Sequence, residues 1–134
     1  MPTLEEVEIQ AAPFNLPEGM INYLPSVLED GEVIEQVAMG YYKESGFSHI
    51  SGHLMVTDRR FIYSLYVKPG TSYTDYFYFS ELKSITVRTS KNLADYRDVI
   101  LIDVADQKFV IERILTIGNH DFFTHIEPLL DSSN

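Results

Sequence analysis

The four histidines are the first side chains that could carry chemistry, because imidazole is a common ligand of zinc. His49 and His53 are four residues apart, and His120 and His125 are five apart. Strand positions four apart are separated by about 13 Å, which is too far for one metal ion. On a helix, residues five apart lie on different faces. We therefore expect polar or partly buried imidazoles, with no metal site and no cofactor.

Nucleophilic and acid–base catalysts are equally hard to find. The chain has no cysteine, which excludes a thiolate nucleophile, disulfide bonds and cysteine-based zinc sites. Ser72, Ser80 and Ser84 lack the glycine context of a nucleophile elbow, and the seven glycines are scattered along the chain. No catalytic carboxylate pair can be singled out among the 20 acids. We expect no enzyme activity.

Two adjacent arginines, Arg59 and Arg60, are candidates for anion recognition. A guanidinium group presents a fork of donors that fits a carboxylate or a phosphate. The simpler interpretation is that one arginine pairs with a local acid such as Asp58 while the other is solvated. We expect Thr57 and both arginines to lie in water at the tip of a hairpin, where the arginines are minor contact candidates.

Tyrosines form a second candidate surface. Alternation along residues 72–79 places two tyrosines on one face of a strand and two phenylalanines on the other. Outward tyrosines serve cross-strand packing or a protein interface, because aromatic residues are enriched in interface hot spots. The candidates are Tyr66, Tyr76 and Tyr78, with Tyr41 and Tyr42 as an extension.

The net charge of −10 limits the classes of partner. The first 42 residues contain no Lys or Arg but eight acids: Glu5, Glu6, Glu8, Glu18, Glu29, Asp30, Glu32 and Glu35. Such a field repels nucleic acid phosphates and anionic lipids. The N-terminus lacks a basic, apolar secretion signal. We expect a cytoplasmic protein that binds no nucleic acid and has no stable membrane association.

Two helical patterns flank a long run of strand patterns. Residues 1–17 read as an acidic arm in which Val7–Ile9 either add an edge strand or stay partly ordered. Residues 18–28 predict a short helix interrupted at Pro25. After Asn119, an apolar stripe predicts a C-terminal helix.

Seven strands are predicted between the helices, with polar turns spaced as in an antiparallel barrel or sandwich. The tightest turn lies between Val56 and Phe61, where the chain folds into a hairpin. The predicted strands begin near Val33, Ile50, Phe61, Ser72, Ser84, Val99 and Lys108. At 134 residues the chain is long enough for one domain with its own core.

Three short motifs, in this order, resemble those of the bacterial pleckstrin-homology-like (PH-like) family with its GRAM-type and YokE-like members. Leu28–Glu32 resembles "L-x-x-G-E", Gly52–Tyr63 resembles "G-x-L-x-L-T-x-x-R", and Phe77–Ile85 resembles "F-x-Y-S-x-I-x-S-V". The resemblance covers about residues 20–130. It divides the chain into an N-terminal arm, 1–17, and a PH-like domain, 18–134.

The resemblance implies a mainly β fold: a seven-stranded antiparallel barrel or sandwich capped by one C-terminal helix. Function follows from a fold only loosely. Eukaryotic relatives often bind phosphoinositides through basic residues near the first strand loops, for which this chain offers Lys43 and Lys68, opposed by Glu44. Several bacterial relatives form ring-shaped homo-oligomers.

Three functional hypotheses follow. The first is a non-enzymatic module for protein association, including self-association through sheet edges or the tyrosine-bearing face. The second is an acidic regulator or decoy that binds a basic partner through residues 1–42. The third is a GRAM-like domain that binds a lipid or small ligand near Lys43 and Lys68.

Overall fold

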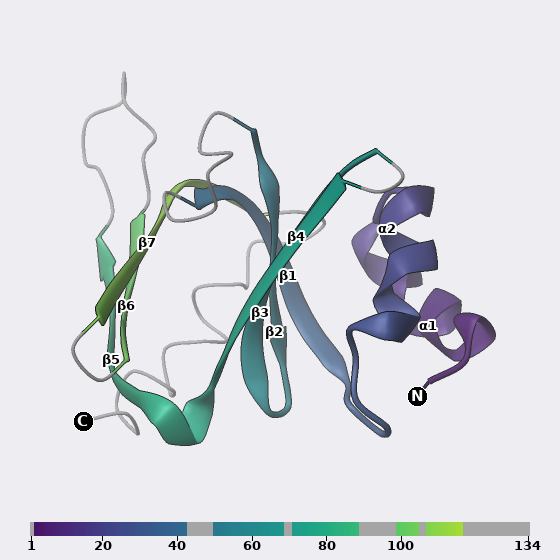
Figure 1. The fold of residues 1–134 in the computed structure, drawn as a ribbon, viewed down its shortest axis with the longest axis horizontal. Coiled ribbons are helices and arrows are strands. Elements are labelled where there is room, and N and C mark those ends of the chain that lie inside the picture. The colour runs from purple at the N-terminus through teal and green to yellow at the C-terminus, as the bar shows by residue number, and fades with distance from the viewer. Residues whose placement is uncertain (1, 43–49, 69–70, 89–98, 105–106, 117–134) are drawn as a thin grey trace.

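The computed structural model describes residues 2–42, 50–68, 71–88, 99–104 and 107–116, and its strands form one antiparallel sheet. The strand order is β4-β3-β2-β1-β7-β6-β5, and the sheet curls into a half-barrel (Figure 1). The strands are β1 (Ile34–Tyr42), β2 (Gly52–Thr57), β3 (Arg60–Lys68), β4 (Thr71–Tyr78), β5 (Leu82–Arg88), β6 (Val99–Val104) and β7 (Gln107–Thr116). The predicted mainly β, antiparallel character is confirmed, whereas the helix predicted after Asn119 lies outside the described residues.

The N-terminal segment is helical, so the edge-strand interpretation of Val7–Ile9 is wrong. Helix α1 (Leu4–Ala11) begins at Thr3, whose hydroxyl accepts a hydrogen bond from the Glu6 N–H. This cap satisfies one of the free N–H groups of the first turn. Val7 and Ala11 lie four residues apart and are fully buried, so they form the apolar side of the helix.

The short helix predicted for residues 18–28 is confirmed, including its break. Helix α2 (Glu18–Tyr23) passes into the 3₁₀ turn η2 (Leu24–Ser26), which contains Pro25. A second 3₁₀ turn, η1 (Ala12–Phe14), joins α1 to the segment before α2. Proline lacks the N–H that would continue the helical hydrogen bonds, so α2 ends before Pro25.

Two apolar clusters lie on opposite faces of the sheet. The inner cluster fills the curl of the half-barrel and includes Tyr42, Leu54, Phe61 and Phe77. The outer cluster joins the sheet to the N-terminal helices, which cover this face in Figure 1. Its members are Val7, Ala11, Phe14, Leu16, Met20, Leu24, Leu28, Ile34, Val37, Met55 and Ile62. Because both faces are covered at this point, every residue of β2 is buried.

Gly52 at the start of β2 leaves room for an inner-face side chain. The Tyr63 hydroxyl donates to the Gly40 carbonyl, and Gly40 and Gly52 are cross-strand partners. A Cβ atom at position 52 would lie 2.6 Å from the Tyr63 ring carbon Cζ and 3.0 Å from the Ser64 carbonyl oxygen. Burial raises the pKa of Tyr63 to about 12, so its hydroxyl stays a donor at neutral pH.

We predict that Gly52→Ala lowers the free energy of unfolding by about 1–3 kcal/mol, because the added methyl group overpacks a buried site. Urea denaturation measures the change. Ser51→Ala, at the neighbouring half-buried position, is the control and should leave the midpoint nearly unchanged. Equal midpoints for Gly52→Ala and the native chain would show that the Tyr63 ring moves aside freely.

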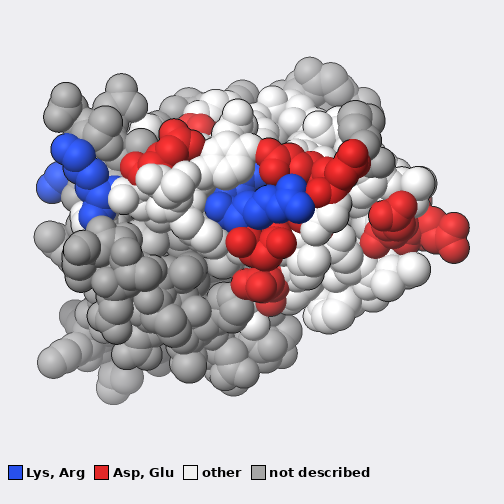
Figure 2. All heavy atoms as spheres, turned by 90° about the horizontal axis from the view of Figure 1, so that it is seen from below, with Lys and Arg blue, Asp and Glu red and all other residues white. Residues whose placement is uncertain are grey.

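Acidic side chains dominate the charge of the described surface. Glu5, Glu6 and Glu8 are exposed on α1, a segment that carries no basic residue. Figure 2 shows basic side chains near the centre of one face with acidic side chains on both sides of them. Basic groups on this face therefore have acidic neighbours close by.

Candidate functional site

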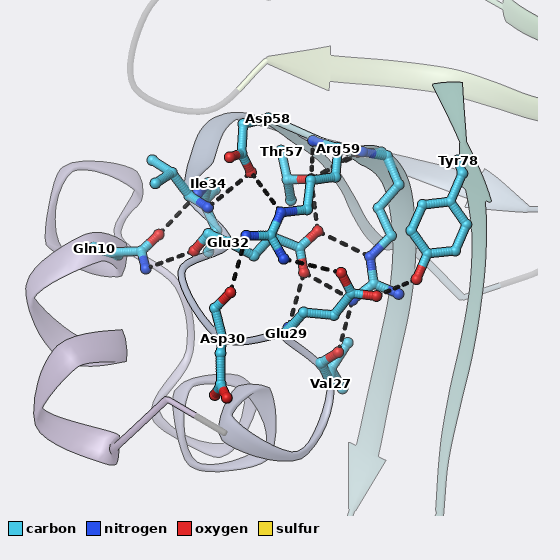
Figure 3. A network of polar contacts seen from close by, with 12 residues as sticks. Gln10, Val27, Glu29, Asp30, Glu32, Ile34, Thr57, Asp58, Arg59 and Tyr78 are labelled. Atoms are coloured by element: carbon cyan, nitrogen blue, oxygen red, sulfur yellow. Dashed lines mark hydrogen bonds and ion pairs between the residues drawn. The ribbon is translucent and has the colours of Figure 1, made fainter. Parts of the chain in front are cut away.

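A buried ion pair links the segment just before β1 to the β2–β3 hairpin (Figure 3). Arg60 donates from Nη2 to Glu32 Oε1 at 2.8 Å and from Nε to Oε2 at 2.9 Å. The carboxylate also accepts from the Thr57 hydroxyl and the Glu29 N–H, and Arg60 Nη2 additionally donates to the Val27 carbonyl. Since Glu32 and Arg60 are only 2% and 3% exposed, this pair is shielded from water.

A tight turn brings Glu32 back onto the hairpin. Gly31 has φ of +75°, a left-handed conformation that glycine adopts without strain. A Cβ atom here would lie 3.3 Å from Arg59 Nη2. The glycine of the Leu28–Glu32 motif therefore allows both the chain reversal and the close approach of Arg59.

The second arginine lies at the surface of the same network. Arg59 Nη1 contacts Glu29 Oε1 at 3.0 Å, Nη2 donates to the Asp30 carbonyl at 2.9 Å, and Nε lies 3.9 Å from Asp58. Asp58 also accepts from the Val33 N–H. The expectation that one arginine pairs with a local acid is met by Arg59. The expectation that Thr57 and Arg60 are solvated is wrong, because the N-terminal helices cover the outer face around them.

An aromatic stack extends the network to the edge of the sheet. The Arg60 guanidinium lies over the Tyr76 ring, 4.7 Å from its centroid, and 5.4 Å from the centroid of Tyr78. The two rings pack edge to face with centroids 5.4 Å apart, and the Tyr78 hydroxyl donates to Glu29. Tyr76 is nevertheless 49% exposed. The ring is thus held on one side and open on another.

Asp75 lies next to this stack, and its carboxylate accepts a hydrogen bond from a backbone N–H of β4. Its Oδ1 accepts from the Tyr76 N–H at 2.9 Å, while Oδ2 accepts from the hydroxyls of Tyr42 and Tyr73. Strand β4 lies at one end of the strand order, so its outer side has no neighbouring strand in the described sheet. An edge strand with free N–H groups invites pairing with another chain. Asp75 removes one such donor from the middle of this edge.

The electrostatics of the network favour charged carboxylates. Burial alone would raise the pKa of Glu32, but hydrogen bonds from Arg60, the Glu29 backbone and Thr57 outweigh it and lower the pKa. Hydrogen bonds from Tyr78 and then Arg59 lower the pKa of Glu29. The same bond to Glu29 raises the pKa of Tyr78. Both carboxylates are ionised at neutral pH and balance the two arginines.

The structure gathers three of the predicted site residues, Arg60, Tyr76 and Tyr78. Arg59 lies beside them, Lys43 lies outside the described residues, and no side-chain position is described for Tyr66 and Lys68. The prediction that Tyr42 extends the tyrosine surface is wrong, because Tyr42 is fully buried in the inner cluster. His53 is 7% exposed, and burial lowers its pKa.

Sequence reasoning missed the partners of these residues. Glu29 and Glu32 belong to one motif, and Thr57 and Arg60 belong to the next. Their order along the chain was visible, but nothing local showed that the acid of the first motif pairs with the arginine of the second. Asp75 gave no signal beyond an acid at the centre of an aromatic strand.

The part of the chain that the structure describes holds neither a candidate metal site nor a helix that could span a membrane. Within it, His, Asp and Glu side chains form no group of three or more that could hold a metal ion. No helix within it combines the length and apolar character needed to cross a membrane.

The fold resembles that of a known structure, although no family model matches the sequence. Neither a protein-family model nor a curated protein matches the sequence. The chain is similar to a DUF1696 family protein with a pleckstrin-homology domain from Shewanella loihica PV-4, whose crystal structure matches with a TM-score of 0.50. The two are 13% identical, and the match covers the full length of both. The chain therefore has a PH-like fold.

Proposed function

We propose that this chain is a non-enzymatic PH-like module whose work is protein association, including self-association. The observation that carries the proposal is Tyr76, an exposed aromatic ring held in place on the rim of the sheet. Among the described side chains, no other aromatic is as exposed. Tyrosine gives a large contact area at low conformational cost, and prior fixation by Arg60 and Tyr78 lowers that cost further.

The hydrogen bonds of β4 favour side-chain contact over strand addition. The Asp75 carboxylate already occupies the Tyr76 N–H, so a partner strand would have to displace it at that position. Beside this, α2 ties to the middle of β4 through the Tyr23 and Thr74 hydroxyls, 2.8 Å apart. We therefore place the contact surface on the ring of Tyr76 and its neighbours on the outer face. We define Tyr76, Tyr78 and Arg60 as the tyrosine rim.

Light scattering coupled to size exclusion tests self-association. We expect the mass to rise above 15.4 kDa with protein concentration, and Tyr76→Ala to shift this rise to higher concentration. Ile9→Ala, which removes an even more exposed apolar side chain from α1, is the control and should behave like the native chain. A photo-crosslinking amino acid at position 76, compared with position 9 in the native cell, extends the test to other protein partners.

Two results together would contradict the proposal. One is a constant mass of 15.4 kDa at every concentration. The other is the same set of crosslinked proteins from positions 76 and 9, which would mean that the tyrosine rim has no partner of its own.

A second candidate function, an acidic regulator that binds a basic partner, is favoured by one observation. The described part of residues 1–42 exposes several carboxylates and contains no basic side chain. Binding of this kind is screened by salt, because its attraction acts between exposed charges. Affinity for a basic partner that is insensitive to salt, or to Glu5→Lys and Glu8→Lys, would contradict this function.

A further inference from the structure

The charges around the tyrosine rim indicate the chemistry of what it binds. Three carboxylates contact the rim directly: Glu29 at the Tyr78 hydroxyl, Glu32 at Arg60 and Asp75 at the Tyr76 N–H. Two more acidic residues lie next to them at Arg59, which contacts the Asp58 carboxylate and the backbone carbonyl of Asp30. Only two guanidinium groups, those of Arg59 and Arg60, stand against them within the described residues. The rim therefore lies in a region of excess negative charge, which attracts cations.

Arg60, which stacks on the Tyr76 ring, does not offset this excess of negative charge. Arg60 forms two charge-assisted hydrogen bonds with Glu32, so its charge is compensated inside the protein. Its guanidinium occupies one side of the Tyr76 ring, and about half of the Tyr76 side chain stays exposed. The face of a tyrosine ring attracts an ammonium or guanidinium group. An anionic ligand would find neither a free arginine nor a free backbone N–H at Tyr76.

We propose that the tyrosine rim receives an arginine or lysine side chain of a protein partner. The cationic group packs on the exposed part of the Tyr76 ring, and the neighbouring carboxylates supply the charge. This inference rests on the proposed function and adds the class of partner residue. The contact is made by side chains, since Asp75 holds the Tyr76 N–H.

A titration of the full chain with short peptides tests the inference. The probes are acetyl-Gly-Arg-Gly-Arg-Gly-amide and the matched peptides in which glutamate or citrulline replaces arginine. Nuclear magnetic resonance spectra of the tyrosine rings report binding at Tyr76. We expect ring shifts at Tyr76 with the arginine peptide and at least about tenfold weaker binding of the other two.

Four variants separate the ring from the general charge of the protein. Tyr76→Ala should weaken binding of the arginine peptide about tenfold, whereas Tyr76→Phe, which keeps the ring, should bind nearly as the native chain does. Asp30, whose backbone carbonyl accepts from Arg59, is nearer in this network to the rim than Glu8 on α1, so Asp30→Asn should weaken binding more than Glu8→Gln, although both remove one charge. Circular dichroism confirms that each variant is folded.

Each outcome decides the inference. Equal affinity of the native chain and Tyr76→Ala, or equal loss in Asp30→Asn and Glu8→Gln, would show that the peptide follows only the total charge, and the inference fails. If the arginine peptide does not bind while Tyr76→Ala still abolishes self-association or position-specific crosslinking, the proposed function stands and this partner class is wrong. Binding to anionic vesicles that depends on Tyr76 would likewise overturn it in favour of a membrane surface.

Discussion

Replacing Arg60 by methionine should lower the free energy of unfolding by about 3–5 kcal/mol. The substitution keeps an apolar chain of similar reach but leaves the buried Glu32 carboxylate without its two arginine donors. An unpaired charge in a water-free site is costly, because neither water nor a counter-ion compensates it. Urea denaturation at neutral pH measures the loss. The Val27 carbonyl also loses its donor, so η2 should loosen with the hairpin.

Arg59→Met is the matched control, with the same chemical change one residue away. The Arg59 side chain is 37% exposed and its partner Glu29 is 39% exposed, so water replaces the lost contacts and the change should be small. The double variant Glu32→Gln, Arg60→Met should recover part of the stability by removing the orphaned charge. If Arg60→Met and Arg59→Met lose the same stability, the pair is not shielded as the structure describes.

The pH dependence should differ in sign between the native chain and Arg60→Met. In the native chain the pKa of Glu32 is lower in the folded state than its ordinary value of 4.5. The stability from this group is therefore full above pH 4.5 and is lost as the pH falls through the lowered, folded-state pKa. Without Arg60, burial is no longer outweighed and raises the pKa of Glu32. The stability gap between the two proteins should then narrow below neutral pH.

Val7→Asn should lower the free energy of unfolding by about 2–4 kcal/mol, from lost apolar burial and a buried amide without a partner. Val7 is fully buried in the outer cluster, where α1 meets the sheet. Ile9→Asn is the matched control on the same helix, because Ile9 is 71% exposed. It should change stability by less than about 0.5 kcal/mol. Thermal and urea denaturation measure both variants.

Equal effects of the two asparagine substitutions would contradict the packing of α1 on the sheet. A further readout separates global from local loss. If α1 alone detaches in Val7→Asn, hydrogen exchange should speed up in Leu4–Ala11 while β2 stays protected. If the whole fold is weakened, protection should fall in both.

Local patterns in the sequence account for most elements. Alternation in residues 72–79 correctly placed Phe77 in the core and Tyr76 outside it, because successive side chains of a strand point to opposite faces. Pro25 correctly predicted the end of α2, because proline has no backbone N–H to continue the helical hydrogen bonds. The α1 helix was missed, since eight residues with few apolar positions give only a weak period.

The candidate site depends on contacts that no local pattern contains. Arg59 and Arg60 are neighbours of the same type, yet one is half-exposed and the other is buried. Arg59 lies in the turn after β2, whereas Arg60 is the first residue of β3, so strand alternation does not relate the two side chains. Whether a side chain at this point is buried or exposed depends on the N-terminal helices, which cover the outer face of the sheet.

By itself, the sequence determined where strands and turns form, the break after α2 and the acidic charge, because these depend on neighbouring residues and composition. Only the tertiary structure decided that Glu32, 28 residues before Arg60, is its partner, and that Tyr78 meets Glu29 across 49 residues. Pairing over such separations follows from strand register and from the helices that exclude water. For that reason the two arginines, which the sequence predicts in water at the tip of a hairpin, differ in the structure: Arg60 is buried and Arg59 lies at the surface beside it. Tyr76 is the exposed aromatic residue of this network.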